Sequence, residues 1–135
     1  MIRELDEQQS YELLSTTTIG RIGFVHGGRV QILPVNFAVS GHELLLRTSP
    51  DGLLAALTQE PAEVSFEVDY HDPLGSTGWS VLAHDTLSRA AEHEAADIVA
   101  RVHPWAGEDR VLPLTLTVES ISGRSVRRDS SRGRI

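Results

Sequence analysis

The fold is decided by the segment IGRIGFVHGGRVQILPVNFAVSGHELLLRT, residues 19–48. It contains three apolar runs, at residues 19–25, 29–39 and 42–48, and glycine-containing breaks separate them. Apolar runs on either side of such breaks are typical of consecutive antiparallel hairpins. The segment therefore predicts three neighbouring strands joined by tight turns.

The end of the third run carries the most informative polar residues. Arg47, Thr48 and Ser49 close the run, and Pro-Asp-Gly at residues 50–52 leads into a helix-like segment. A guanidinium, hydroxyl groups and a helix N-terminus are the groups that a phosphate dianion requires. This pattern predicts a site for a phosphorylated ligand. The local pattern also fits an ordinary strand end, in which Arg47 is solvated and Ser49 or Asp51 caps the helix.

The remaining chain alternates between strand-like and helix-like segments. We expect helices at residues 5–14, 50–60 and 91–102, and further strands at residues 62–70, 78–90 and 111–121. About six strands and three short helices, mostly joined by tight turns, indicate a mainly β protein whose antiparallel sheet closes into a barrel. One domain over residues 1–126 and a basic tail over residues 127–135 are predicted.

Composition excludes several classes of function. The 135 residues include no cysteine and no lysine, so thiolate catalysis, Schiff-base chemistry and a P-loop lysine are excluded. A net charge of −7 argues against nucleic-acid binding. We expect no membrane span and no signal peptide, which predicts a cytoplasmic protein. The arginine-rich tail is interpreted as a solvated end or as an arm that contacts an acidic partner or a ligand phosphate.

Scattered residues carry weaker signals. Gly20 and Gly23 lie inside a strand pattern, which indicates a bulge or a close approach by a ring or another backbone. The six histidines include no HxH or HxxxH pair, so no metal site is predicted. His84 and Asp85 are neighbours whose side chains should point apart in a strand. No catalytic acid, base or nucleophile is assigned.

The only two tryptophans, Trp79 and Trp105, lie beside glycine or proline in an aromatic-poor chain. Two interpretations stay open for them. They fill the core, or they form a flat wall for a planar ligand.

Several segments in order resemble a known family. They are LPVNF (33–37), LLRTS (45–49), AEVSFEVD (62–69), GWSV (78–81), PWA (104–106) and ISGR (121–124). Together they resemble the pyridoxamine 5′-phosphate oxidase-like family of FMN-binding split barrels, closest to its nitroimidazole-resistance-type branch, common in actinobacteria. The resemblance extends from Glu4 to about Val126.

This resemblance implies a six-stranded antiparallel split barrel that forms a homodimer, with FMN in the grooves between subunits. It also implies that Arg47, Thr48 and Ser49 hold the phosphate, that the backbone at residues 35–37 follows the isoalloxazine edge, and that Trp79 lines the groove. The full set of implied cofactor-binding residues is Val35, Asn36, Phe37, Arg47, Thr48, Ser49, Gly52, Leu53, Trp79, Ser80 and Trp105. The implied activity is a flavin-dependent oxidoreductase acting on a small organic molecule.

One position departs from the family pattern. The family usually has a lysine shortly after the threonine or serine, whereas Leu53 follows Gly52 here. Loss of this cation keeps three alternatives open. The same barrel uses a deazaflavin coenzyme, it binds no redox cofactor, or it is a non-catalytic module that binds a flavin, a haem or a lipid-like ligand.

Overall fold

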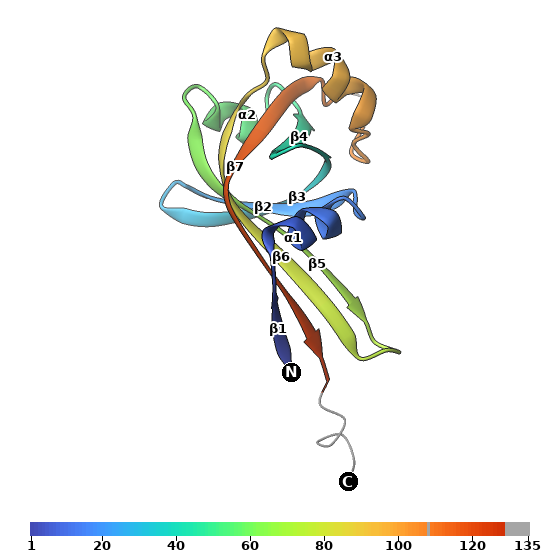
Figure 1. Ribbon diagram of the computed structural model, residues 1–135. Helices are drawn as coiled ribbons and strands as arrows, with labels where there is room; N and C mark the ends of the chain where they lie inside the picture. Colours follow the sequence, from blue (N-terminus) through green and yellow to red (C-terminus); the bar gives the residue numbers. More distant parts are fainter. Residues whose placement is uncertain (108, 129–135) are drawn as a thin grey trace.

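The computed structural model describes residues 1–107 and 109–128. In these residues short helices interrupt a long antiparallel sheet (Figure 1). The elements are β1 (Ile2–Leu5), α1 (Glu7–Leu14), β2 (Ile19–His26), β3 (Arg29–Ser40), β4 (Glu43–Thr48), α2 (Leu53–Leu57), β5 (Ala62–Asp72), β6 (Thr77–Arg89), α3 (Glu92–Arg101) and β7 (Leu112–Arg127).

The sheet closes on itself. Its strand order is β1-β7-β4-β3-β2-β5-β6, and β6 pairs again with β7. Six strands therefore form a ring, which confirms the mainly β barrel expected from the sequence. A seventh strand, β1, adds to the ring from outside it. This strand was not predicted, because residues 2–5 carry no strand-like alternation and pair with a strand about 120 positions away.

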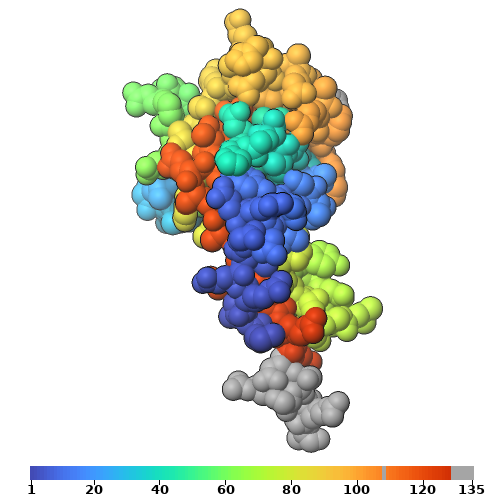
Figure 2. Space-filling view, viewed as in Figure 1, coloured from blue at the N-terminus to red at the C-terminus, as the bar shows by residue number. Residues whose placement is uncertain are grey.

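Part of the sheet projects beyond the barrel as an arm. The start of β6 pairs with the end of β7 from Thr77 opposite Arg127, and β1 pairs with the same end of β7. In Figure 1 these strands and the end of β5 extend downward, away from α2 and α3, and Figure 2 shows the arm to be narrower than the barrel body.

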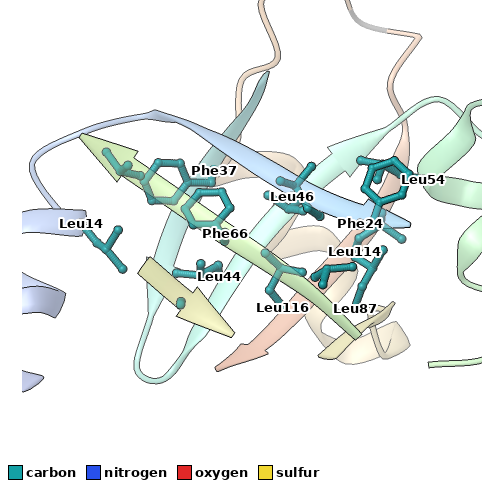
Figure 3. Packing of buried hydrophobic residues seen from close by; sticks show 14 of the residues in the cluster. Leu14, Phe24, Phe37, Leu44, Leu46, Leu54, Phe66, Leu87, Leu114 and Leu116 are labelled. Atoms are coloured by element: carbon teal, nitrogen blue, oxygen red, sulfur yellow. The ribbon is translucent and has the colours of Figure 1, made fainter. Parts of the chain in front are cut away.

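Aromatic and aliphatic side chains fill the barrel (Figure 3). Phe37 and Phe66 pack edge to face with ring centroids 4.9 Å apart, and they are 3% and 0% exposed. Gly20 lies against the Phe66 ring, so closely that a Cβ at position 20 would overlap the ring. The sequence prediction of a close ring approach at this glycine is confirmed.

Several element bounds differ from the expected ones. The helix expected at residues 50–60 is reduced to the five residues of α2, because Pro50 and Gly52 lie in the preceding turn. The last strand continues past residue 121 to Arg127, because β1 and β6 pair with its second half. The predicted tail therefore begins inside β7, and residues 129–135 lie outside the described residues. Within the described ranges, no helix has the length and apolar character needed to cross a bilayer.

Candidate functional site: a cleft at the split of the barrel

The barrel splits between β3 and β4. Residues 29–36 of β3 pair with β2, whereas β3 pairs with β4 only from Phe37 to Ser40. β4 leaves β3 and continues along β7 as far as Thr48. Residues 33–36 of β3 therefore have one edge without a strand partner. Pro34 is compatible with such an edge because it lacks the N–H of a ladder hydrogen bond.

A cleft of about 410 Å³ lies along this open edge, and we call it the split cleft. It is lined by Leu33, Pro34, Val35, Asn36, Arg47, Thr48, Ser49, Gly52, Leu53, Leu54, Pro104, Ala106 and Arg110. Seven of the predicted cofactor-binding residues are thus brought together in one cavity, although they come from β3, β4, the turn before α2 and the first residue of α2. Their role in binding a cofactor remains a prediction.

Arg47 is anchored in the wall of the split cleft and is 7% exposed. Its Nε donates to the carbonyl oxygen of Arg110 (2.9 Å), and its Nη1 donates to the carbonyl oxygens of Val102 (2.9 Å) and Val99 (3.4 Å). These carbonyls belong to the last turn of α3 and the segment after it, where helical carbonyls lack intrahelical partners. Arg47 therefore fixes the end of α3 beside the cleft.

Asn36, on β3, holds the segment that follows α3 on the opposite side of the cleft from Arg47. Its Nδ2 donates to the carbonyl oxygen of Thr18 (3.3 Å), and its Oδ1 accepts the backbone N–H of Trp105 (3.0 Å). We call residues 103–107 and 109–111 the covering loop, because Pro104, Ala106 and Arg110 form one wall of the cleft. Asn36 and Arg47 together hold this loop against the open edge of β3.

The turn before α2 leaves room beside the hydroxyl of Thr48. The N–H of Gly52 donates to the carbonyl oxygen of Ser49 (3.0 Å). A Cβ at position 52 would lie 3.3 Å from that oxygen and 3.6 Å from Thr48 Oγ1. A side chain there would fill part of the cleft, so this glycine keeps the space open.

Four predicted residues lie elsewhere. Phe37 is buried in the core, which its place in the apolar pattern of β3 explains. Trp79 and Ser80 line a separate hollow of about 550 Å³ on the arm, where Trp79 stacks on Tyr70 with centroids 6.3 Å apart. Trp105 belongs to the covering loop and is 80% exposed, so it does not fill the core.

A second cleft of about 790 Å³ lies beside the β2–β3 hairpin, and we call it the hairpin cleft. It is lined by Arg21, Gly23, Phe24, Val25, Val30, Ile32, Glu63, Val64, Ser65, Glu67, His84, Asp85 and Glu119. Four of these are carboxylic acids and one is an arginine. The split cleft shows the opposite balance, with two arginines and no acid among its described lining residues.

Asp85 is the most unusual residue of the hairpin cleft. It is 2% exposed, and neither carboxylate oxygen has a hydrogen-bond partner among the described residues. Burial raises the pKa of Asp85 to about 7, and the nearby charge of Glu119 adds to the shift. A break in the register between β6 and β7 occurs at this point, between His84 and Asp85.

The sequence analysis assigned no functional role to two of these residues, Asp85 and Arg110. The expectation that His84 and Asp85 point apart is confirmed, since His84 is exposed and Asp85 is buried. Strand alternation with Val81, Ala83 and Leu87 could have placed Asp85 on the inner face. No local signal marked Arg110, because only the tertiary fold brings it to Arg47.

Comparisons with known proteins agree with this architecture. The fold is similar to the FAD-binding protein from Mycobacterium smegmatis, with a TM-score of 0.75 and 23% identity over 94% of this chain and 100% of that one. It is also similar to a candidate 5-nitroimidazole antibiotic resistance protein from Bacteroides thetaiotaomicron, with a TM-score of 0.70 and 12% identity over 93% and 89% of the chains.

In sequence, the chain is 26% identical over 132 residues to the uncharacterized protein Rv0080 of Mycobacterium tuberculosis, covering 94% of this chain and 87% of that protein. The family model described as pyridoxamine 5′-phosphate oxidase matches residues 6–125, which span the barrel from α1 through most of β7. The chain therefore belongs to the pyridoxamine 5′-phosphate oxidase family and has its split-barrel fold.

Proposed function

We propose that this chain is an FMN-dependent oxidoreductase that works as a cytoplasmic homodimer on a small organic molecule. The observation that carries the proposal is the charge of the split cleft. Among the residues that the structure describes, two arginines and no acid line it, in a chain whose net charge is −7. A cavity with this charge favours an anionic ligand.

The remaining walls fit the other parts of a flavin nucleotide. Thr48 and Ser49 supply hydroxyl groups, and Gly52 leaves space next to them. The edge of β3 at residues 33–36 supplies backbone groups that no strand occupies. The volume of about 410 Å³ is in the range of small-molecule sites, about 300–1,000 Å³. The FAD-binding relative with the same fold supports a flavin as the ligand class.

In this proposal the chain binds and orients, and the bound flavin supplies the hydride- and electron-transfer chemistry. Arg47, Thr48 and Ser49 surround the phosphate end, and the β3 edge lies along the ring system. In the described part of the chain, the residues that line the split cleft include no carboxylic acid and no histidine. We therefore assign no general acid or base to the protein.

A second copy of the chain is proposed because an apolar face is uncovered. Val25, Val30 and Ile32 are 67%, 73% and 64% exposed and neighbour one another on the β2–β3 hairpin. Burying such a face is favourable at about 25 cal/mol per Å² of apolar surface. Trp79 and Ser80 lie apart from the split cleft of their own chain. In a dimer, Trp79 and Ser80 of one copy could line the split cleft of the other copy.

The test is a titration of the purified protein with FMN, followed by flavin fluorescence and the visible spectrum. We expect binding with a micromolar or lower Kd and a stoichiometry of one FMN per chain in a dimer. Reduction of the bound flavin by a nicotinamide donor and reoxidation by an organic acceptor would establish turnover. Absence of FMN binding at micromolar concentrations would reject the proposal.

The deazaflavin alternative is favoured by one specific observation, the lack of the family lysine after Gly52. A competition titration between FMN and a reduced deazaflavin coenzyme separates the two, because the ligands compete for the same cleft. The non-catalytic alternative predicts flavin binding without turnover of any donor and acceptor pair. It is favoured by the fact that the cleft lining, over residues 1–107 and 109–128, contains no carboxylic acid and no histidine.

A further inference from the structure

The lysine missing from the sequence raises the question of which second cation the split cleft uses. Arg110 lies at the end of the covering loop, close in space to Arg47 but 63 positions away in the chain. It lines the split cleft together with Thr48 and Ser49. It is therefore the other positively charged residue among the described residues that form this cavity.

The two arginines are held in different ways. The guanidinium of Arg47 donates to three backbone carbonyls, and one of these is the carbonyl of Arg110 itself. This bond fixes the backbone of Arg110 at the cleft without using its side chain. Arg110 is half-buried, and in residues 1–107 and 109–128 no hydrogen bond or ion pair of its guanidinium is found.

The energetic consequence follows from these contacts. The Arg47 guanidinium already donates to three carbonyls, so turning it toward a ligand would break some of these hydrogen bonds and cost free energy. The Arg110 guanidinium has no carboxylate partner among the described residues, so no existing ion pair has to be broken before it binds an anion. Arg47 therefore holds the backbone of the covering loop, and the side chain of Arg110 is available to bind the ligand.

We propose that Arg110 is the second cation of the split cleft and binds the phosphate of the ligand, while Arg47 is a positioning residue that presents it. The inference rests on the proposed function, because it assumes a phosphorylated ligand in this cleft. It differs from the sequence-based expectation, in which Arg47 was the cleft arginine that holds the phosphate and Arg110 had no assigned role.

The experiment compares two probes, FMN and riboflavin, which differ only by the phosphate. Loss of one charge-assisted contact should raise the Kd of FMN about 10- to 100-fold in Arg110→Ala. The Kd of riboflavin should change less than about twofold, because riboflavin lacks the anion. Arg110→Lys keeps the charge and should lose less FMN affinity than Arg110→Ala.

Arg29→Ala is the matched control, because it removes the same charge from the exposed first position of β3 and lines neither cleft. It should leave both Kd values unchanged. An unchanged FMN affinity in Arg110→Ala, or an equal loss for FMN and riboflavin, would overturn the inference and leave Arg110 as part of the wall only.

Failure of the proposed function has a different signature. Wild-type protein that binds neither FMN nor riboflavin would reject the flavin, whatever Arg110 does. The anion site is then tested with inorganic phosphate alone, by the melting temperature. Stabilisation of the wild type and of Arg29→Ala, but not of Arg110→Ala, would support Arg110 as the anion-binding cation, and no stabilisation of any of them would reject it.

Discussion

The split cleft and the hairpin cleft each contain one charged residue with almost no exposure, and the two residues are in opposite situations. Arg47 in the split cleft is 7% exposed and donates to three carbonyl oxygens. Asp85 in the hairpin cleft is 2% exposed and has no partner for either oxygen in the described part of the chain. Hydrogen bonds to neighbouring carbonyls compensate the burial of the Arg47 charge, whereas no described group compensates the burial of Asp85.

The difference teaches which buried charge stabilises the fold. A buried cation that satisfies carbonyls at a helix end ties two elements together, here α3 and β4. A buried carboxylate without donors is costly, so the group shifts its pKa and holds a proton instead. The split cleft is therefore expected to gain stability from its charge, whereas the hairpin cleft loses stability when Asp85 ionises.

The largest effect expected from this contrast is the pH dependence that Asp85 introduces. Its folded-state pKa of about 7 lies above the ordinary value of 3.8. Between these values the folded state keeps a proton that the unfolded chain has released, so raising the pH favours unfolding. At about 1.4 kcal/mol per pKa unit, the free energy of unfolding should fall by roughly 4 kcal/mol from below pH 4 to above pH 7 through this group alone.

Urea unfolding across this pH range measures the slope. Asp85→Asn, which does not titrate, should remove most of it and be more stable than the wild type at pH 8. The exposed Asp97→Asn, on the outer face of α3, is the matched control and should keep the wild-type slope. Parallel curves for wild type and Asp85→Asn would show that the buried carboxylate is compensated.

The second effect is the loss of stability when the Arg47 side chain is removed, whereas Asp85→Asn should raise stability at pH 8. Arg47→Ala leaves the carbonyls of Val102 and Arg110 without their donor in a part-buried place. Each lost charge-assisted bond is worth about 1.5–3 kcal/mol, so we expect a loss of about 3 kcal/mol in the free energy of unfolding. Arg110→Ala should cost less than about 0.5 kcal/mol, as is usual for substitutions outside the core. Equal losses at the two positions would remove the distinction between them.

The sequence predicted much of the fold because its signals are local. The hairpins of residues 19–48 follow from apolar runs and the glycines at the turns, and Gly27, Gly28 and Gly41 have the positive φ angles that such turns need. The start of α1 is equally local, since the carboxylate of Asp6 accepts the backbone N–H of Gln9 at 2.8 Å. These features need no knowledge of distant residues.

The split cleft was only half predictable for the same reason. The run Arg47-Thr48-Ser49 and the glycine after it mark one wall in the sequence, and the structure places them side by side. The other wall comes from the covering loop, which reaches the cleft through bonds from Asn36 and Arg47 over 69 and 63 positions. No periodicity or turn motif reports such contacts, so the positioning use of both side chains was not foreseen.

A smaller effect is expected where Asn36 holds the covering loop. Asn36→Ala removes the acceptor for the N–H of Trp105 and one donor to Thr18. One neutral hydrogen bond contributes about 1 kcal/mol, so the backbone amide of Trp105 should exchange with solvent about five- to tenfold faster. Asn36→Asp retains the acceptor oxygen and should keep the protection. Unchanged exchange in Asn36→Ala would mean that Arg47 alone holds the loop.

The smallest effect is expected from the ion pairs of Arg21 at the rim of the hairpin cleft. Its Nη1 lies 2.9 Å from Oε1 of Glu67 and 3.3 Å from Oδ1 of Asp69. These side chains are 54%, 34% and 51% exposed, so water already solvates their charges. A double-mutant cycle with Arg21→Ala and Glu67→Ala should give a coupling of only about 0.5 kcal/mol, and added salt should reduce it. Asp85 lines the same cleft, yet its ionisation is expected to change stability several times more. Burial, and not the number of charges, therefore decides what each acid in this cleft costs, and a rim coupling as large as the Asp85 effect would contradict that rule.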